Sequence, residues 1–381
     1  MKVGILTHPL RTNYGGILQN YALHVVLKRM GHHVLTIDRH NDKSICYILI
    51  SYIKRNIQYY LLGKKNISTS FYLNLTRKQF VYISKNIQSF IDKYIDTTHY
   101  ISSNLKLQET LKYDFDAYIV GSDQIWNKSY APSCFLDFLG DMKVLRIAYA
   151  ASFGGEYWNY SRKMTEKCSK LASKFNAVSV REKSAVDLCR DNLKIDSTHV
   201  LDPTLLLDRE DYLDLVEKTD GENKENILMC YILDDSLEKR EMISYLCQYF
   251  NLNPLEIKAK ESEFKKDVSL DNMVVPSISK WLAGFRDAKF VITDSFHGMI
   301  MAIIFKKQFA VIGNKRRGIA RFKSLLSQLN IINRMIDTMP DLIHLVDLNV
   351  DIDYPLVDSI IRENRKKSMR FIEKSLCNNL K

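Results

Sequence analysis

The stretch KVGILTHPLRTNYGGILQNYALHVVLKRMGHHVLTID, residues 2–38, decides the fold. An apolar strand at residues 3–7 leads through a polar loop into a helix at about residues 17–30, and a second strand follows at residues 34–38. A strand, a crossover helix and another strand favour parallel pairing through a right-handed connection. The opening therefore predicts an α/β protein built on parallel sheets.

The same alternation recurs twice along the chain. Strands are expected at residues 115–120, 144–150, 177–181 and 200–201, with a helix near residues 160–175; a second set of strands and helices runs from residue 227 to residue 329. The polar stretch at residues 217–226 between the sets is typical of an interdomain linker. Two doubly wound, Rossmann-like domains facing a cleft are the predicted architecture.

Domain boundaries follow from these sets. An N-terminal domain is expected over residues 1–215, and residues 42–110, which are rich in Ile, Tyr, Lys and Asn at helical spacing, are interpreted as a helical insertion in it. A C-terminal domain is expected over residues 225–350. The last segment, residues 351–381, is predicted to be a helix that packs back on the N-terminal domain.

Composition narrows the class of protein without choosing a ligand. The 381 residues carry a net charge of +11, which suits a small anionic substrate, an anionic membrane surface or nucleic acid. The seven cysteines are scattered without metal-like spacing, and the N-terminus lacks a signal-peptide pattern. We therefore expect reduced thiols, no metal and a cytoplasmic protein.

The stretch ICYILISYIKRNIQYYLL, residues 45–62, is too short and too interrupted by charge to span a bilayer. It could form an amphipathic helix at a membrane surface, although such a run is more often a core helix or a lid. A peripheral contact with the inner face of a membrane is therefore one expectation of the sequence.

Ligands of open α/β sheets collect at the carboxyl ends of the strands, so the residues that follow each strand are candidates for a site. The segment TDSFHG, residues 293–298, leads from a strand into an apolar helix, and Ser295 or Asp294 would cap that helix. The amides around Phe296, His297 and Gly298 would then face an anion. The alternative is that His297 only pairs with Asp294.

Three further positions carry charge at strand ends. The turn GNKRRG at residues 313–318 offers Lys315 and Arg316 to the same anion, unless it is an ordinary solvated turn. Arg181 ends an apolar strand, where its planar fork suits a carboxylate, although an internal ion pair with Glu182 or Asp202 explains it equally well. Asp123 is a candidate base, or simply a capping residue.

Other motifs are absent. The NYGG loop matches neither GxGxxG nor a phosphate-binding P-loop, no GxSxG elbow occurs, and no His, Cys or Asp cluster has metal-ligand spacing.

With these residues in hand, the chain resembles the polysaccharide pyruvyl transferase family. The resemblance runs in order from residue 3 to about residue 326, through GILTHPLRTNYGGILQNYAL, FDAYIVGSDQIWN, RIAYAASFGG, VSVREKSA, LDPTLLL and TDSFHGMIMAIIFKKQFAVIGNK. The segments are specific as a set, although each is weak alone. Ala148 departs from the Ser or Thr that is common in the family at its position.

The resemblance implies a fold similar to the glycosyltransferase B type and a reaction in which pyruvate from phosphoenolpyruvate forms a ketal with two hydroxyls of one sugar. The donor would be bound by Arg181 of the N-terminal domain and by Ser295, Phe296, His297, Gly298, Lys315 and Arg316 of the C-terminal domain, with His297 as the proton donor. Asp123 would orient or deprotonate the sugar. The acceptor side would comprise Asn13, Gly15, Gly16, Gln19, Ser122, Asp123 and Ser152.

The implied partners are phosphoenolpyruvate and a glycan of the cell surface or its lipid-linked or nucleotide-linked precursor, with no cofactor and no nucleic acid. A glycosyltransferase that uses a nucleotide sugar remains an alternative, because two doubly wound domains serve both reactions. A non-catalytic basic binding protein is a third reading, although the basic residues are dispersed and no RNA-binding aromatic motif accompanies them.

Overall fold

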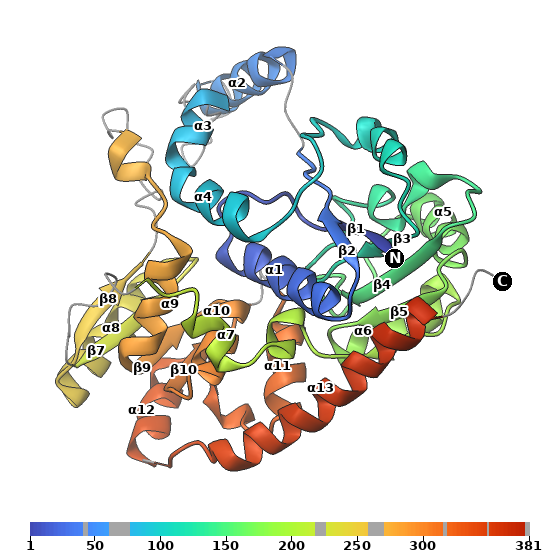
Figure 1. Cartoon of the computed structure of the whole chain (residues 1–381). Coiled ribbons are helices and arrows are strands. Elements are labelled where there is room, and N and C mark those ends of the chain that lie inside the picture. Colours follow the sequence, from blue (N-terminus) through green and yellow to red (C-terminus); the bar gives the residue numbers. More distant parts are fainter. Residues whose placement is uncertain are drawn as a thin grey trace.

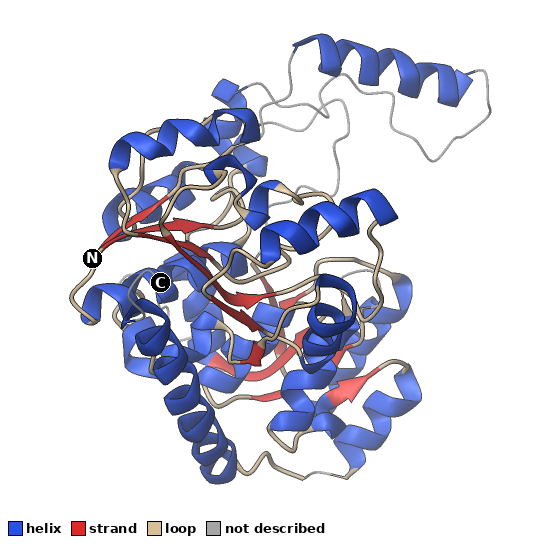
Figure 2. Cartoon of the chain, turned by 90° about the vertical axis from the view of Figure 1, so that its right-hand side faces the viewer, coloured by secondary structure: helices blue, strands red, loops and turns tan. Residues whose placement is uncertain are grey.

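The computed structural model describes residues 1–40, 45–60, 77–217, 226–257, 270–314, 318–348 and 350–377 (Figure 1). It contains a six-stranded and a five-stranded sheet, and every pairing between neighbouring strands is parallel. Helices lie against the sheets, as Figure 2 shows from the side. The predicted α/β class with two parallel sheets is confirmed.

The first sheet has the strand order β2-β1-β3-β4-β5-β6. Its strands are β1 (Lys2–Leu6), β2 (His33–Thr36), β3 (Ala117–Val120), β4 (Leu145–Ala151), β5 (Ala177–Val180) and β6 (Thr198–His199). Every residue of β3 and β4 is buried, as expected for central parallel strands covered on both faces. The register of β4 against β5 shifts between Ala148 and Ala151, so the carboxyl end of β4 bends next to the cleft.

The helices of this domain are α1 (Tyr14–Arg29), α5 (Arg162–Ala172), α6 (Lys183–Leu188) and α7 (Arg209–Leu213). Helix α1 begins where the side chain of Asn13 accepts a hydrogen bond from the amide of Gly16 at 3.2 Å. It is followed by Gly31 at φ 83°, a left-handed conformation that favours glycine. The start of α1 is thus fixed by the loop that also borders the cleft.

An insertion separates β2 from β3. It contains α2 (Ile45–Tyr60), α3 (Arg77–Ile83), α4 (Lys85–Tyr94) and a 3₁₀ helix at Asn104–Tyr113. Helix α4 buries Ile87, Phe90 and Ile91, whereas α2 projects from the body of the molecule (Figures 1 and 2).

The second sheet has the order β11-β10-β9-β7-β8. Its strands are β7 (Ile227–Tyr231), β8 (Asn253–Glu256), β9 (Ala288–Thr293), β10 (Gln308–Ile312) and β11 (Met335–Ile336). Its helices are α8 (Leu237–Phe250), α9 (Ile278–Asp287), α10 (Phe296–Ile304), α11 (Ile319–Gln328) and α12 (Met339–Asp347). Helix α10 is buried over nearly its whole length, so its first turn is held firmly against the core.

The last helix, α13 (Tyr354–Cys377), connects the two domains along one side of the molecule (Figure 1). At its start, the hydroxyl of Tyr354 donates to the carbonyl of Ala302 in α10 at 3.4 Å. Further along, Ser368 Oγ accepts from the amide of Leu201, which follows β6, at 3.0 Å. Within the described ranges, none of the helices combines the length and the apolarity needed to cross a membrane.

Candidate active site

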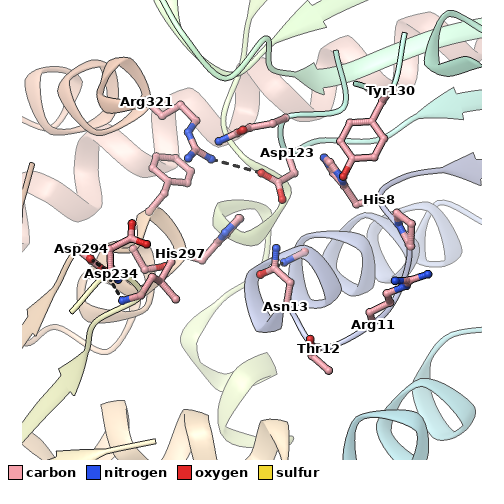
Figure 3. A pocket seen from close by; sticks show the side chains of 16 residues that line it. His8, Arg11, Thr12, Asn13, Asp123, Tyr130, Asp234, Asp294, His297 and Arg321 are labelled. Atoms are coloured by element: carbon pink, nitrogen blue, oxygen red, sulfur yellow. Dashed lines mark hydrogen bonds and ion pairs between the residues drawn. The ribbon is translucent and has the colours of Figure 1, made fainter. Parts of the chain in front are cut away.

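A cavity of about 730 Å³ opens between the two sheets (Figure 3). It lies at the carboxyl ends of β1, β3, β7 and β9, the edge at which open parallel sheets bind ligands. The lining residues are His8, Pro9, Arg11, Thr12, Asn13, Gly16, Asp123, Gln124, Tyr130, Leu233, Asp234, Asp294, Ser295, Phe296, His297 and Arg321. Both domains therefore contribute to one pocket.

The loop after β1 forms one wall of this pocket. Gln19, in the second turn of α1, donates through Nε2 to Thr7 Oγ1 and to the carbonyl of Gly16, both at 2.8 Å. These bonds fix the loop from behind. A methyl group on Gly15 would come within 2.1 Å of His297 Nδ1, so the backbone of the N-terminal domain contacts an imidazole of the C-terminal domain here.

The buried carboxylate of Asp202, which follows β6, is the centre of the polar contacts behind the pocket. Its Oδ2 accepts from Arg181 Nη1 at 2.6 Å and from Ser122 Oγ at 3.2 Å, and its Oδ1 accepts from the amide and the hydroxyl of Thr204. Burial alone would raise the pKa of Asp202, but His297, Arg181 and the hydrogen bond from Thr204 lower it well below the usual range. Asp202 is therefore an anion at neutral pH.

His297 faces this carboxylate across the domain boundary. Its Nε2 lies 3.5 Å from Asp202 Oδ2, and no hydrogen bond reaches that buried nitrogen within the described residues. The contact is an ion pair only when the imidazole is protonated. A histidine placed between a carboxylate and an open pocket can be oriented by the first and exchange a proton with a ligand in the second.

Two arginines pack against the ring of Phe296 but face different surroundings. Arg181 lies 4.7 Å from the ring centroid, is only 1% exposed in its side chain, and pairs with Asp202 and with Asp123. Arg321, from α11, lies 5.1 Å from the same centroid and lines the pocket. Burial and the neighbouring Arg181 lower the pKa of Arg321 to about 10, so it still carries its charge at neutral pH.

Asp123 follows β3 with a φ of 68°, an uncommon conformation for a residue with a side chain. Its carboxylate accepts from Arg181 Nη2 at 3.2 Å and from Arg321 Nη1 at 3.4 Å. Burial alone would raise the pKa of Asp123, but His8, Arg181, His297 and Arg321 lower it below the usual range. Asp123 therefore holds a negative charge in the pocket and binds a proton weakly.

The first turn of α10 offers free donors to the pocket. Ser295 Oγ caps the helix by accepting from the amide of Gly298 at 3.3 Å. The amides of Phe296 and His297 have no hydrogen-bond partner within the described residues. A helix start of this kind favours an anion. Gly298 is needed for another reason, because a Cβ there would lie 2.4 Å from Thr293 Oγ1 in β9.

Asp294 serves a structural role beside this turn. Its carboxylate accepts from the amides of Leu233 and Asp234 at 2.6 and 3.0 Å and from Lys239 Nζ at 2.7 Å. Asp234 in turn accepts from Asn314 Nδ2 at 2.7 Å. The loops after β7, β9 and β10 are therefore held together by these two carboxylates.

His8 stands on the opposite wall, with its ring 4.4 Å from the ring of Tyr130 in an edge-to-face contact. Burial lowers the pKa of His8, although the charge of Asp123 opposes the shift. A neutral imidazole thus lies near a permanently charged carboxylate.

The structure brings most of the predicted site residues together. Asn13, Gly16, Asp123, Ser295, Phe296 and His297 line the pocket, and Gly15, Gln19, Ser122, Ser152, Arg181 and Gly298 lie among the residues that support it. Ser152 Oγ, for example, donates to Glu182 Oε1 at 2.8 Å rather than facing the pocket. Lys315 and Arg316 lie outside the described residues.

Arg181, for which the sequence left two roles open, lies behind the pocket. Its guanidinium faces Asp202 and Asp123 rather than the pocket, which is the internal pairing with Asp202 that the sequence left open. Sequence reasoning missed His8, Tyr130, Asp234 and Arg321. His8 stands at the carboxyl end of a predicted strand, so its position could have marked it as a candidate. Arg321 lies inside a helix, where nothing in the sequence distinguishes it from other basic residues.

No group of three or more His, Cys, Asp or Glu side chains could hold a metal ion in the part of the chain that the structure describes.

Two Rossmann-like domains with a pocket between their sheets define the glycosyltransferase B-type class of fold. Three solved structures share it over nearly the whole chain. They are a UDP-GlcNAc 2-epimerase from Neisseria meningitidis bound to UDP-GlcNAc (TM-score 0.55, 10% identity, 100% of both chains), a protein described as a UDP-N-acetylglucosamine 2-epimerase from Listeria monocytogenes (0.57, 9%, 99% of this chain and 96% of that one) and a glycosyltransferase from Rickettsia africae (0.54, 12%, 99% of both). These identities show a shared fold and no more.

Sequence comparison gives the family. The model of the polysaccharide pyruvyl transferase family matches residues 13–316, and the chain belongs to that family. No curated protein matches the chain significantly in sequence.

Proposed function

We propose that the protein transfers pyruvate from phosphoenolpyruvate onto a sugar of a cell-surface glycan or its precursor, as a ketal, and releases phosphate. One observation carries this proposal beyond family membership. The LDP and DSFHG segments, far apart in the sequence, meet where His297 Nε2 lies 3.5 Å from Asp202 Oδ2 at the edge of a pocket built from both domains. Such a pair suits a reaction that moves a proton between a donor and an acceptor.

The donor brings a carboxylate and a phosphate, so it needs two neighbouring cationic or N–H-rich positions. The amides of Phe296 and His297 supply one, and Arg321, whose guanidinium packs on the Phe296 ring, supplies the other. Arg181 holds Asp123 and Asp202 in place from behind. Lys315 and Arg316 remain proposed phosphate contacts on the strength of the sequence.

The chemistry balances with two hydroxyls and one donor. His297, as imidazolium, protonates the methylene carbon or the departing phosphate. One sugar hydroxyl attacks C2 as the carbon–carbon double bond is protonated, the bond from C2 to the phosphate oxygen breaks, and the second hydroxyl attacks the same carbon. The two sugar hydroxyls release two protons. One returns to His297 and replaces the proton that it delivered to the methylene carbon, and the other leaves with phosphate.

The acceptor then lies against the N-terminal wall, between Asn13, Asp123 and His8. Because its pKa is held low, Asp123 suits orientation of a hydroxyl and stabilisation of positive charge on C2 better than final uptake of a proton. The neutral imidazole of His8 is the better proton acceptor on this side.

The test is incubation of the purified protein with phosphoenolpyruvate and a panel of lipid-linked and nucleotide-linked sugars. Mass spectrometry should detect an acceptor heavier by about seventy mass units, pyruvate added less water, together with released phosphate. The His297→Ala variant should lose phosphate release and keep its thermal unfolding profile. Release of a nucleotide instead of phosphate would favour the glycosyltransferase alternative, and full activity of the variant would remove His297 from the proton transfer.

A further inference from the structure

The positive charge of the chain is concentrated in one segment. Residues 43–91 contain eight Lys and Arg residues and no Asp or Glu, so this segment supplies eight of the eleven net charges of the whole protein. The basic residues are Lys43, Lys54, Arg55, Lys64, Lys65, Arg77, Lys78 and Lys85. The segment corresponds to most of the helical insertion between β2 and β3.

Helix α2 of this insertion presents an apolar stripe to solvent, formed by Ile50, Ile53 and Ile57. Their exposed fractions are 64%, 55% and 46%, and their spacing of three and four residues places them on one side of the helix. Lys54 lies at the edge of the stripe and is exposed. Three exposed isoleucines on one helix face are unusual for a surface that meets only water.

The insertion is fastened beside the pocket. The guanidinium of Arg11, a lining residue, lies 5.3 Å from the ring centroid of Phe80 in α3. Asn86 in α4 donates to the carbonyl of Val275 in the C-terminal domain at 2.9 Å, and Tyr82 donates to Asp271. Helices α3 and α4 of the insertion therefore lie beside the acceptor side of the pocket, and α2 precedes them in the same insertion.

We propose that α2 docks on an anionic lipid bilayer through the apolar stripe and Lys54. A helix of 16 residues without an acidic side chain suits a position in the plane of the interface, where isoleucines enter the acyl boundary and Lys or Arg meet anionic headgroups. Three partly exposed isoleucines present far less area than the roughly 800 Å² per partner that a specific protein interface buries. The bilayer is the occupant that matches both the charge and the small apolar area.

From this docking we infer that the acceptor sugar is carried on a membrane lipid. This inference about the acceptor rests on the proposed function. The enzyme would then stand with its pocket beside the headgroup layer, where such a glycan begins.

Sedimentation with vesicles tests the docking without any substrate. The protein should bind phosphatidylglycerol-containing vesicles, bind pure phosphatidylcholine vesicles much more weakly, and be released by salt. Changing Ile50, Ile53 and Ile57 together to Ser should weaken binding at least about tenfold, and Lys54→Glu about fivefold or more. Matched controls are Leu237→Ser, at a 79% exposed leucine of α8, and Lys374→Glu in α13, which should both bind like the unchanged protein.

Equal binding to both kinds of vesicle, or unchanged binding by the triple serine variant, would overturn the docking. So would a change in the oligomeric mass of that variant without vesicles, because it would show that the stripe binds a second copy of the chain. The acceptor class has its own readout. The triple variant should transfer less pyruvate to a vesicle-embedded acceptor and keep its rate on a water-soluble one. If the unchanged protein binds vesicles but transfers pyruvate to none of the acceptors, the result counts against the proposed function and not against the docking.

Discussion

Gly15 shows how a residue without a side chain can control the position of His297, the proposed proton donor. A methyl group at this position would come within 2.1 Å of His297 Nδ1, closer than nonbonded atoms can approach. Either the imidazole or the loop after β1 must then move, and a displacement of about 1 Å can lower a rate about a hundredfold.

We therefore expect Gly15→Ala to lower phosphate release by about a hundredfold while the protein still folds. Gly155→Ala is the matched control, because a Cβ there meets no atom within 4 Å. Equal rates in the two variants would show that His297 does not need its present position.

Asp202 combines structural and chemical roles in one buried carboxylate. The Asp202→Asn change removes the charge that faces both Arg181 and His297, and it leaves the guanidinium of Arg181 with only Asp123 as an ion-pair partner within the described residues. Removing one partner of a buried ion pair costs about 3 kcal/mol of unfolding free energy. Urea denaturation should show this loss, whereas an unchanged midpoint would mean that water or rearrangement compensates for the charge.

The sequence identified the residues that directly follow strands, because parallel strands bring their carboxyl ends to one edge. Asn13, Asp123 and His297 were found in this way and all line the pocket. Arg321 could not be found, since it reads as an ordinary basic residue in the amphipathic pattern of α11. The sequence could not predict which carboxylate pairs with Arg181, because Glu182 and Asp202 are both near it in sequence. The structure shows that Asp202 is the partner.

Among the elements, α13 supports the segment that carries Asp202. Arg365 donates through Nε to the carbonyl of Leu205 and through Nη2 to the carbonyl of Leu207, both at 2.8 Å, and it pairs with Asp208. These carbonyls belong to the turn that begins at Pro203, directly after Asp202.

We expect Arg365→Ala to lower the unfolding free energy by about 2 kcal/mol, because it removes charged hydrogen bonds to two carbonyls. Lys366→Ala, at the neighbouring exposed position, should change it by less than about 0.5 kcal/mol. Thermal melts of both variants measure the difference. A fall in kcat without a change in KM for Arg365→Ala would show that the turn also positions Asp202.

Periodicity predicted the long elements well and the short ones poorly. The 14 residues of α8 fall within the set of strands and helices expected from residue 227 onward, and α13 lies within residues 351–381, where the last helix was expected. The sequence predicted neither β11, which has only two residues, nor α12, whose apolar residues follow a short polar turn. A two-residue strand cannot show an alternating pattern, so only its pairing with β10 reveals it.

For the molecule as a whole, buried His24 in α1 links stability to pH. Burial, with a contribution from Lys28, lowers the pKa of His24 to about 4, against an ordinary value of 6.5, and Asp96 offsets this only in part. Below pH 6.5 the unfolded chain therefore gains a proton that the folded protein excludes until about pH 4. The contribution of His24 to the unfolding free energy must therefore decrease as the pH falls from 6.5 to about 4, and it stays constant below about pH 4.

Between pH 7 and pH 5 we expect His24 to account for a loss of about 2 kcal/mol in unfolding free energy. Urea denaturation at both pH values measures it. The His24→Gln variant should lose less stability over the same interval than unchanged protein, whereas His33→Gln, at an exposed histidine in β2, should behave as the unchanged protein does. Parallel curves for all three proteins would contradict the shift.

Helix α13 touches α10 at one end and the segment after β6 towards the other, so it acts as a tie between the domains that hold His297 and Asp202. Its 24 residues span about 36 Å of continuous helix, a length that bends little. Any hinge motion that widened the pocket would have to pivot about this rod or break one of its attachments. If the pocket opens to admit a bulky glycan, the two domains should therefore rock relative to each other along α13. In that motion the distance from His297 to Asp202 changes before either domain deforms.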